Sequence, residues 1–146
     1  MGAYLLRRYL TLYSGQVTGA VICGTGCVPE LLVRTGMLVC LVLEKFLGGH
    51  HRSRFITEIC FGGAYKKFEK DPQDVTGSWL SKNKESVRAY KQDKRCTFQF
   101  TLNGYYGMFL TISYDNRLKH VRRIRKDLPV LFIAGKDDPV GNFGKG

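Results

Sequence analysis

Two adjacent carboxylates, Asp137 and Asp138, end the stretch of this 146-residue sequence that is most suggestive of chemistry. They follow the apolar run 130–134 after a glycine and a lysine, and Pro139 comes directly after them. A carboxylate in such a place can hold a histidine in one tautomer and stabilise its protonated form. The same residues are also ordinary for a turn before proline, and the pattern alone favours that structural interpretation.

The cysteines and histidines do not form a second candidate site. Five cysteines, an odd number in irregular spacing, predict free thiols in a reducing compartment, and Cys23 and Cys40 lie in apolar runs typical of buried side chains. No second Cys or His pair joins Cys23 and Cys27 to complete a zinc site. His50-His51 is a possible ligand pair but more typical of a polar stretch at a helix end. We therefore expect no metal and no cofactor.

The net charge of +11, from 23 Lys and Arg against 12 Asp and Glu, raises an alternative hypothesis. The chain could be a small basic module that binds RNA or an anionic surface through Arg122, Arg123, Arg125 and Lys126. Aromatic side chains are not interleaved with these basic residues, as a base-stacking platform requires. A solvated basic surface is the simpler interpretation, so we expect no nucleic acid as partner.

No membrane or export segment is expected. The most apolar segment, 37–43, is flanked by Arg34 and Glu44 and is much shorter than the roughly 20 residues that a membrane span needs. Arg7 and Arg8 interrupt the only early apolar stretch, which excludes a secretory signal there. These features predict a cytoplasmic protein without a transmembrane segment.

The apolar pattern predicts two buried strands separated by mostly helical material. Leu5, Tyr9 and Leu12 recur at helical spacing and predict a helix over 2–14 that Gly15 ends. The runs 17–23 and 130–134 are continuous rather than alternating, which is typical of parallel strands covered on both faces.

Local signals divide the segment between the two strands. Pro29 suits the first position of a helix that runs to about residue 47 and ends at Gly48. A broken helical pattern follows over 50–70, and 71–78 reads as a loop. Asn83 and Thr101 are expected to cap two further helices, the first to residue 90 and the second across 105–112.

Several stretches resemble an α/β-hydrolase, specifically its lysophospholipase and monoacylglycerol-lipase branch, which is grouped with serine aminopeptidases of the S33 type. That branch carries Gly-His-Ser-Met-Gly followed by a helix, and this chain opens Met1-Gly-Ala-Tyr-Leu-Leu-Arg-Arg-Tyr-Leu10. The stretch Phe61-Gly-Gly-Ala-Tyr-Lys-Lys-Phe68 is similar to a lid segment, with three differences in its middle. Residues 126–133 and 138–146 also match in order, so the resemblance covers essentially the whole chain.

The resemblance implies a partial α/β-hydrolase fold with a post-nucleophile helix, two parallel core strands and a helical cap insertion. Its parts would be core over 1–26, cap over 27–126 and core over 127–146. Asp138 would be the acid of the catalytic triad, the backbone N–H of Met1 an oxyanion donor, and Gly2 the last residue of the nucleophile elbow.

The resemblance further implies that the nucleophilic Ser immediately precedes Met1 and that the catalytic His follows Gly146. The chain would then be an internal fragment that is inactive alone. Its parent would cleave carboxylic esters, lysophospholipid or monoacylglycerol, through an acyl-enzyme. An aromatic lid would contact the acyl chain through Phe61, Tyr65, Phe68, Trp79 and Phe98.

Overall fold

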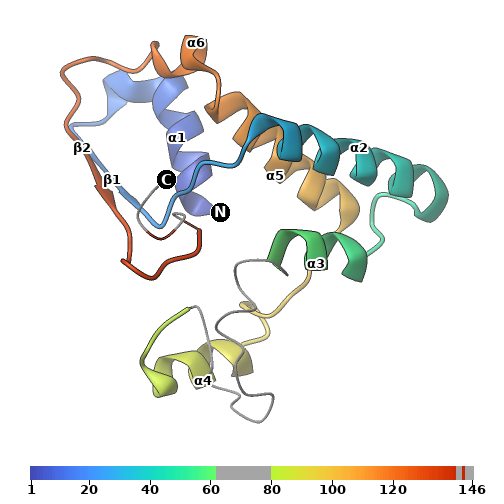
Figure 1. Cartoon of the computed structure of the whole chain (residues 1–146). Coiled ribbons are helices and arrows are strands. Elements are labelled where there is room, and N and C mark those ends of the chain that lie inside the picture. Colours follow the sequence, from blue (N-terminus) through green and yellow to red (C-terminus); the bar gives the residue numbers. More distant parts are fainter. Residues whose placement is uncertain (62–79, 141–142, 144–146) are drawn as a thin grey trace.

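The fold is of the mixed α/β class, with helices and two parallel strands arranged as in part of an α/β-hydrolase. The computed structural model describes residues 1–61, 80–140 and 143. Figure 1 shows the element order along the chain: α1 (Gly2–Tyr13), the 3-10 turn Ser14–Gln16, β1 (Ala20–Cys23), α2 (Glu30–Leu47), α3 (Arg54–Phe61), α4 (Lys84–Gln92), α5 (Leu102–Asp115), α6 (Leu118–Val121) and β2 (Val130–Ile133).

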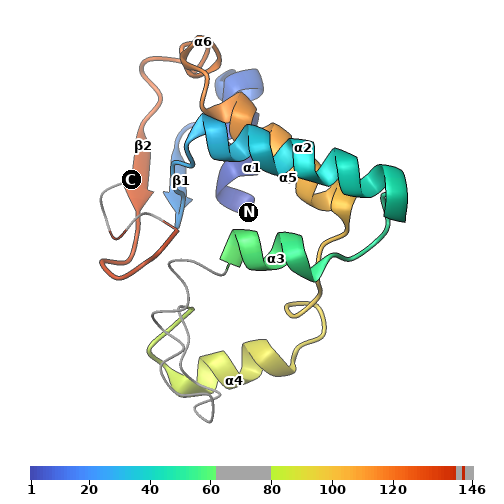
Figure 2. The ribbon, with the colours of Figure 1, turned by 45° about the vertical axis from the view of Figure 1, so that its right-hand side comes forward.

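The two strands pair in parallel although the chain between them contains most of the helices. The register runs from Ala20 opposite Val130 to Cys23 opposite Ile133. Both strands therefore end at one edge of the sheet. Helix α1 runs the opposite way, so its first turn lies near that same edge in both views of the ribbon (Figures 1 and 2).

The predicted parallel pairing is confirmed, but the predicted cover on both faces is wrong for the described residues. Ile22 faces α1 and is 1% exposed, where it packs with Leu10 and Leu128. On the opposite face, Val21 is 58% and Leu131 55% exposed. The apolar runs predict burial, and α1 provides it on one face and only in part, since Phe132, opposite Ile22, is 61% exposed.

The helix boundaries follow local backbone chemistry. The side chain of Asn83 accepts the N–H groups of Glu85 and Ser86, and that of Thr101 accepts the N–H of Gly104, so both predicted caps are confirmed. Helix α2 ends at Gly48, whose φ of 81° is accessible to glycine without strain. Of the broken pattern over 50–70, α3 is described; residues 62–79, including the predicted loop 71–78, lie outside the described residues.

The larger core lies between α2 and α5, with a contribution from α1. Val33 and Cys40 of α2 pack with Tyr105 of α5 and with Tyr4 of α1. The predicted burial of the cysteines is confirmed for Cys40 and wrong for Cys23, which is exposed because it lies on the bare face of the sheet.

Gly36 sets how closely α2 and α5 approach, and this contact yields a stability prediction. A Cβ at Gly36 would lie 2.7 Å from Cζ of Phe109, whereas a Cβ at Gly107 of α5 would meet nothing within 4 Å. Overpacking costs roughly 1–3 kcal/mol, and alanine regains up to about 1 kcal/mol of helix preference. In urea denaturation, Gly36→Ala should lower the free energy of unfolding by about 1 kcal/mol, while the control Gly107→Ala should raise it. Equal stabilisation by both variants would contradict this packing.

Asp115, the last residue of α5, is a buried carboxylate without compensation. It is 2% exposed, and neither side-chain oxygen has a hydrogen-bond partner. Burial raises the pKa of Asp115 from 3.8 to about 6, although Arg7 and Arg8 act in the opposite direction. Because the folded chain holds this proton more tightly than the unfolded chain, ionisation costs stability.

Asp115→Asn should therefore change how stability depends on pH. Stability of the unsubstituted chain should fall as pH rises from about 4 to 6, and the full cost, on the order of 2 kcal/mol, should persist above pH 6. The variant should gain stability at pH 7 and differ little from the parent at pH 4, as measured by denaturation at each pH. Asp127→Asn, at an exposed ion pair with Arg125, serves as the control and should leave the profile unchanged.

Candidate functional site

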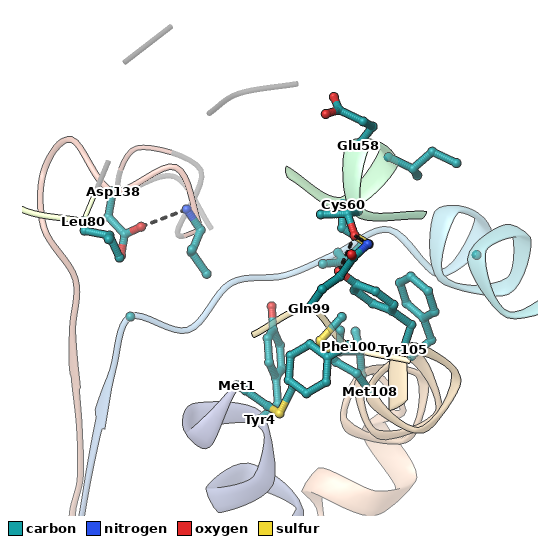
Figure 3. Close-up of a pocket in the computed structure, with 18 of the residues that line it drawn as sticks. Met1, Tyr4, Glu58, Cys60, Leu80, Gln99, Phe100, Tyr105, Met108 and Asp138 are labelled. Carbon is teal, nitrogen blue, oxygen red and sulfur yellow. Dashed lines mark hydrogen bonds between the residues drawn. The ribbon is translucent and has the colours of Figure 1, made fainter. Parts of the chain in front are cut away.

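A cavity of about 1700 Å³ opens at the edge of the sheet where both strands end. Its walls come from the first turn of α1, from α2, α3 and α5, from the segment 95–100 and from the turn after β2. Figure 3 shows that Met1 and Tyr4 lie on one side and Asp138 on another. The described lining is mainly apolar and aromatic, but it also includes seven charged residues: Arg54, Glu58, Lys82, Arg95, Lys136, Asp137 and Asp138. An apolar lining with polar groups is the usual composition of a small-molecule site.

Asp138 is held in a tight turn next to the end of β1. Its N–H donates to the carbonyl of Gly135 at 3.0 Å, and its Oδ1 accepts the N–H of Val140 at 2.9 Å. A Cβ at Gly24 would lie 3.5 Å from Oδ2, so the carboxylate rests against the residue that follows β1. The half-buried side chain therefore has a defined place at the wall of the cavity.

The neighbouring Asp137 has a different environment. Its carboxylate is 60% exposed and forms an ion pair with Nζ of Lys82 at 3.2 Å. An exposed pair of this kind contributes little to stability. Asp137 therefore faces solvent, and of the two carboxylates Asp138 is the one with a fixed position.

Met1 and Gly2 lie at the start of α1, as the sequence predicts. The carbonyl of Met1 accepts the N–H groups of Tyr4 and Leu5, and Met1 lines the same cavity as Asp138. The unpaired N–H groups and the dipole at the start of this 12-residue helix favour a negative charge there. The structure thus brings Met1 and Asp138 to one cavity, while their roles in catalysis stay predictions.

A contact that the sequence reasoning missed connects α1 to the turn of Asp138. Arg7 donates to the carbonyl of Gly26 at 3.2 Å and to Oγ1 of Thr25 at 3.4 Å. Gly26 also lies against the carbonyl of Val140, so closely that a Cβ at position 26 would collide with the carbonyl oxygen. In the sequence, the stretch Gly24-Thr-Gly26 marks this contact. The stretch is too short for a dinucleotide-binding motif, and its glycine at position 26 permits the close approach to Val140.

A second missed feature is a polar group on the far wall of the cavity. Thr57 Oγ1 lies 2.8 Å from Nε2 of Gln99 and 3.0 Å from the hydroxyl of Tyr105. Burial raises the pKa of Tyr105, which keeps its hydroxyl protonated. These three residues are far apart in the sequence and form no motif, so no sequence pattern could have identified them.

The predicted lid is described only in part. Phe98 lines the cavity, is 56% exposed and packs edge-on against Phe100 with ring centroids 5.0 Å apart. Tyr65, Phe68 and Trp79 lie outside the described residues, as does the side chain of Phe61. The lid therefore stays a prediction for all five aromatic residues, of which Phe98 is the one that the structure places at the cavity.

The described lining of the cavity contains three carboxylates, Glu58, Asp137 and Asp138, but no histidine. His120 is buried elsewhere, where it stacks on Tyr114 with ring centroids 3.6 Å apart. Ser81 is the one serine of the described lining, and its Oγ accepts the N–H of Asn83. Within the described residues, Asp138 thus has neither a base nor an activated nucleophile beside it.

Two further findings concern metals and membranes. Across residues 1–61, 80–140 and 143, no three His, Cys, Asp or Glu side chains gather as metal ligands would. None of the helices in this part of the chain has the length and apolar character that a membrane span requires.

Comparison with known proteins agrees with the architecture. A family model described as serine aminopeptidase, S33, matches residues 1–146. Searches of the curated proteins and of the solved structures each found no match. The family match covers the whole chain and, like the parallel strands and the cavity at their ends, indicates a hydrolase of the α/β-hydrolase kind. The chain belongs to the serine aminopeptidase S33 family of the α/β-hydrolase superfamily.

Proposed function

We propose that this chain is the part of a serine hydrolase that carries the triad acid and the cap, and that the enzyme cleaves the carboxylic ester of a lysophospholipid or monoacylglycerol. The observation that carries the proposal is that Asp138 and the first turn of α1 line one largely apolar cavity. In a serine hydrolase the helix that follows the nucleophile lies at the reacting ester and the acid lies one residue away, behind the His, so both belong to one site.

The proposed chemistry gives each of these groups one task. A Ser placed directly before Met1 attacks the ester carbonyl, and a His takes the proton from its hydroxyl. The backbone N–H of Met1 and the start of α1 stabilise the negative charge on the carbonyl oxygen. Asp138 holds the His in the required tautomer and stabilises its protonated form. The protonated His then gives its proton to the alcohol oxygen of the ester, the bond from that oxygen to the acyl carbon breaks, and the alcohol leaves. In the second half, the His takes a proton from water, which attacks the acyl carbon; the bond to the Ser oxygen breaks, the Ser regains its proton from the His, and the fatty acid is released.

The cavity walls support an acyl chain as part of the substrate. Val28 and Leu32 near the start of α2 and Met108 and Phe109 of α5 all line the cavity. Apolar walls recognise a hydrocarbon chain by removing it from water, at roughly 0.8 kcal/mol for each buried methylene group. This argument favours a lipid ester over a small polar ester.

The alternative of a basic binding module has less support. Arg125 forms an ion pair with Asp127 at 2.9 Å, and its backbone N–H donates to Oγ of Ser14, so the densest basic run partly serves to anchor the entry to β2. The family match over the whole chain favours the hydrolase proposal.

The first test uses the 146-residue chain alone. A fluorophosphonate probe should not label it, because loss of triad members costs several orders of magnitude in rate. Labelling is read by gel fluorescence and by mass spectrometry of any modified serine, with a characterised serine hydrolase as the positive control. Modification of one serine at the rate of an active enzyme would overturn the proposed division of the triad.

The second test uses a longer polypeptide that supplies the Ser and the His. There Asp138→Asn should lower kcat for a p-nitrophenyl ester by about ten-thousand-fold, as expected when the triad acid is lost. The matched variant Asp137→Asn removes an adjacent, solvent-facing carboxylate and should stay within about twofold of the parent. An equal effect of both substitutions would show that Asp138 is not the acid.

A further inference from the structure

The polar group formed by Thr57, Gln99 and Tyr105 is a hydrogen-bonded feature of the cavity wall. Thr57 Oγ1 donates to the carbonyl of Ser53 at 3.2 Å and lies 2.8 Å from Nε2 of Gln99 and 3.0 Å from the hydroxyl of Tyr105. A hydroxyl has one proton to donate and two lone pairs. With its proton donated to Ser53, Thr57 accepts from both Gln99 and Tyr105, so its hydrogen-bonding capacity is fully used. Figure 3 shows Gln99 and Tyr105 close together at the cavity.

This arrangement leaves part of the Gln99 carboxamide available. One N–H is taken by Thr57, while the carbonyl oxygen and the second N–H have no partner among the described residues. Gln99 is half-buried and lines the cavity. The carbonyl oxygen of Gln99 is not fully buried, so it is open to the cavity, where a ligand can replace the water that bonds it.

The amide is also held in place from two directions. Thr57 on α3 fixes the end of the side chain, and the N–H of Leu102 donates to the carbonyl of His51 at 2.9 Å, which anchors the backbone just after Gln99. Phe100 packs edge-on against Tyr105 with centroids 5.6 Å apart. A carboxamide so positioned can discriminate between ligands by hydrogen bonding because it has little freedom to turn away.

We propose that Gln99 is a specificity-determining residue that binds a hydroxyl group in the head of the substrate, with Thr57 and Tyr105 as positioning residues. A hydroxyl both donates and accepts, and so matches the unused carbonyl oxygen and N–H of the carboxamide. The substrate class is then an acyl ester whose alcohol part carries a free hydroxyl, such as a glyceryl ester. This inference rests on the proposed function, because it takes the cavity to be the ester site.

The test measures binding to the 146-residue chain by chemical-shift titration. The probes are 1-monooctanoylglycerol and methyl octanoate, which share the acyl chain and differ in the glyceryl hydroxyls. We expect the glyceryl ester to bind about tenfold more tightly, the ratio that hydrogen bonds to one neutral amide provide. A short-chain lysophosphatidylcholine is a third probe and distinguishes a phospholipid source of the hydroxyl from a neutral glyceride.

Gln99→Leu should reduce the tenfold preference to about one, and Thr57→Val should do the same because it releases the amide. Thr57→Ser retains the hydroxyl and should restore the preference, which a purely structural role would not predict. Gln92→Leu is the matched control, since Gln92 is an exposed glutamine at the end of α4 outside the cavity. Circular dichroism identifies any variant that fails to fold. If Gln99→Leu fails to fold, the conclusion rests on the comparison of Thr57→Val with Thr57→Ser.

The outcomes separate this inference from the proposed function. If neither octanoyl ester binds the unsubstituted chain, the proposed lipid-ester site is wrong and the inference falls with it. If both esters bind with equal affinity, or if Gln99→Leu keeps the preference, the inference is overturned while the proposed function stands.

Discussion

The parallel pairing of β1 with β2 is the constraint on which the rest of the structure depends. It joins residues from opposite ends of the chain, with Cys23 opposite Ile133, and it makes both strands end at one edge. The turn of Asp138 leaves from one strand and the loop of Gly24 and Gly26 from the other, so the two loops must meet. Without this register the carboxylate of Asp138 would have no fixed relation to α1.

The contact between those loops shows how small residues determine the geometry of a site. Arg7 of α1 holds the carbonyl of Gly26, and Gly26 in turn lies directly against the carbonyl of Val140. Val140 donates its N–H to Asp138, so a continuous series of contacts runs from the first helix to the candidate acid. Each contact is short-ranged, and a side chain at position 26 would interrupt the series.

The helices give the cavity both an apolar wall and a hydrogen-bonding group. Close packing of α2 against α5 at Gly36 fixes the apolar wall, and the caps at Asn83 and Thr101 decide where the neighbouring helices begin. The group around Thr57 adds an amide held by a hydrogen bond to that wall. An apolar wall accommodates many acyl chains, whereas one oriented amide can select among their head groups.

The bare face of the sheet has an energetic consequence. Val21, Leu131 and Ile133 expose apolar side chains side by side, and an exposed strand edge can pair with other chains. A parallel pair is stable only when helices cover both of its faces. The apolar runs that encode these strands therefore indicate more burial than the described residues provide.

The sequence by itself determined what short-range chemistry controls. Helical spacing, the caps at Asn83 and Thr101, the stop at Gly48 and the parallel character of two apolar runs all follow from neighbouring residues, and each is confirmed. The family resemblance distinguished Asp138 from Asp137, because a local sequence pattern cannot tell which of two adjacent carboxylates in a turn is the catalytic acid.

Only the tertiary structure decided which distant residues meet. The exposure of Cys23, the isolation of Asp115 and the grouping of Thr57, Gln99 and Tyr105 depend on contacts between segments far apart in the chain. No local pattern encodes such contacts, because a hydrogen bond or a covered face requires a partner that only the packing of elements supplies. The pattern of polar and apolar residues indicates which surfaces need to be buried, and the packing of the elements determines which residues cover them.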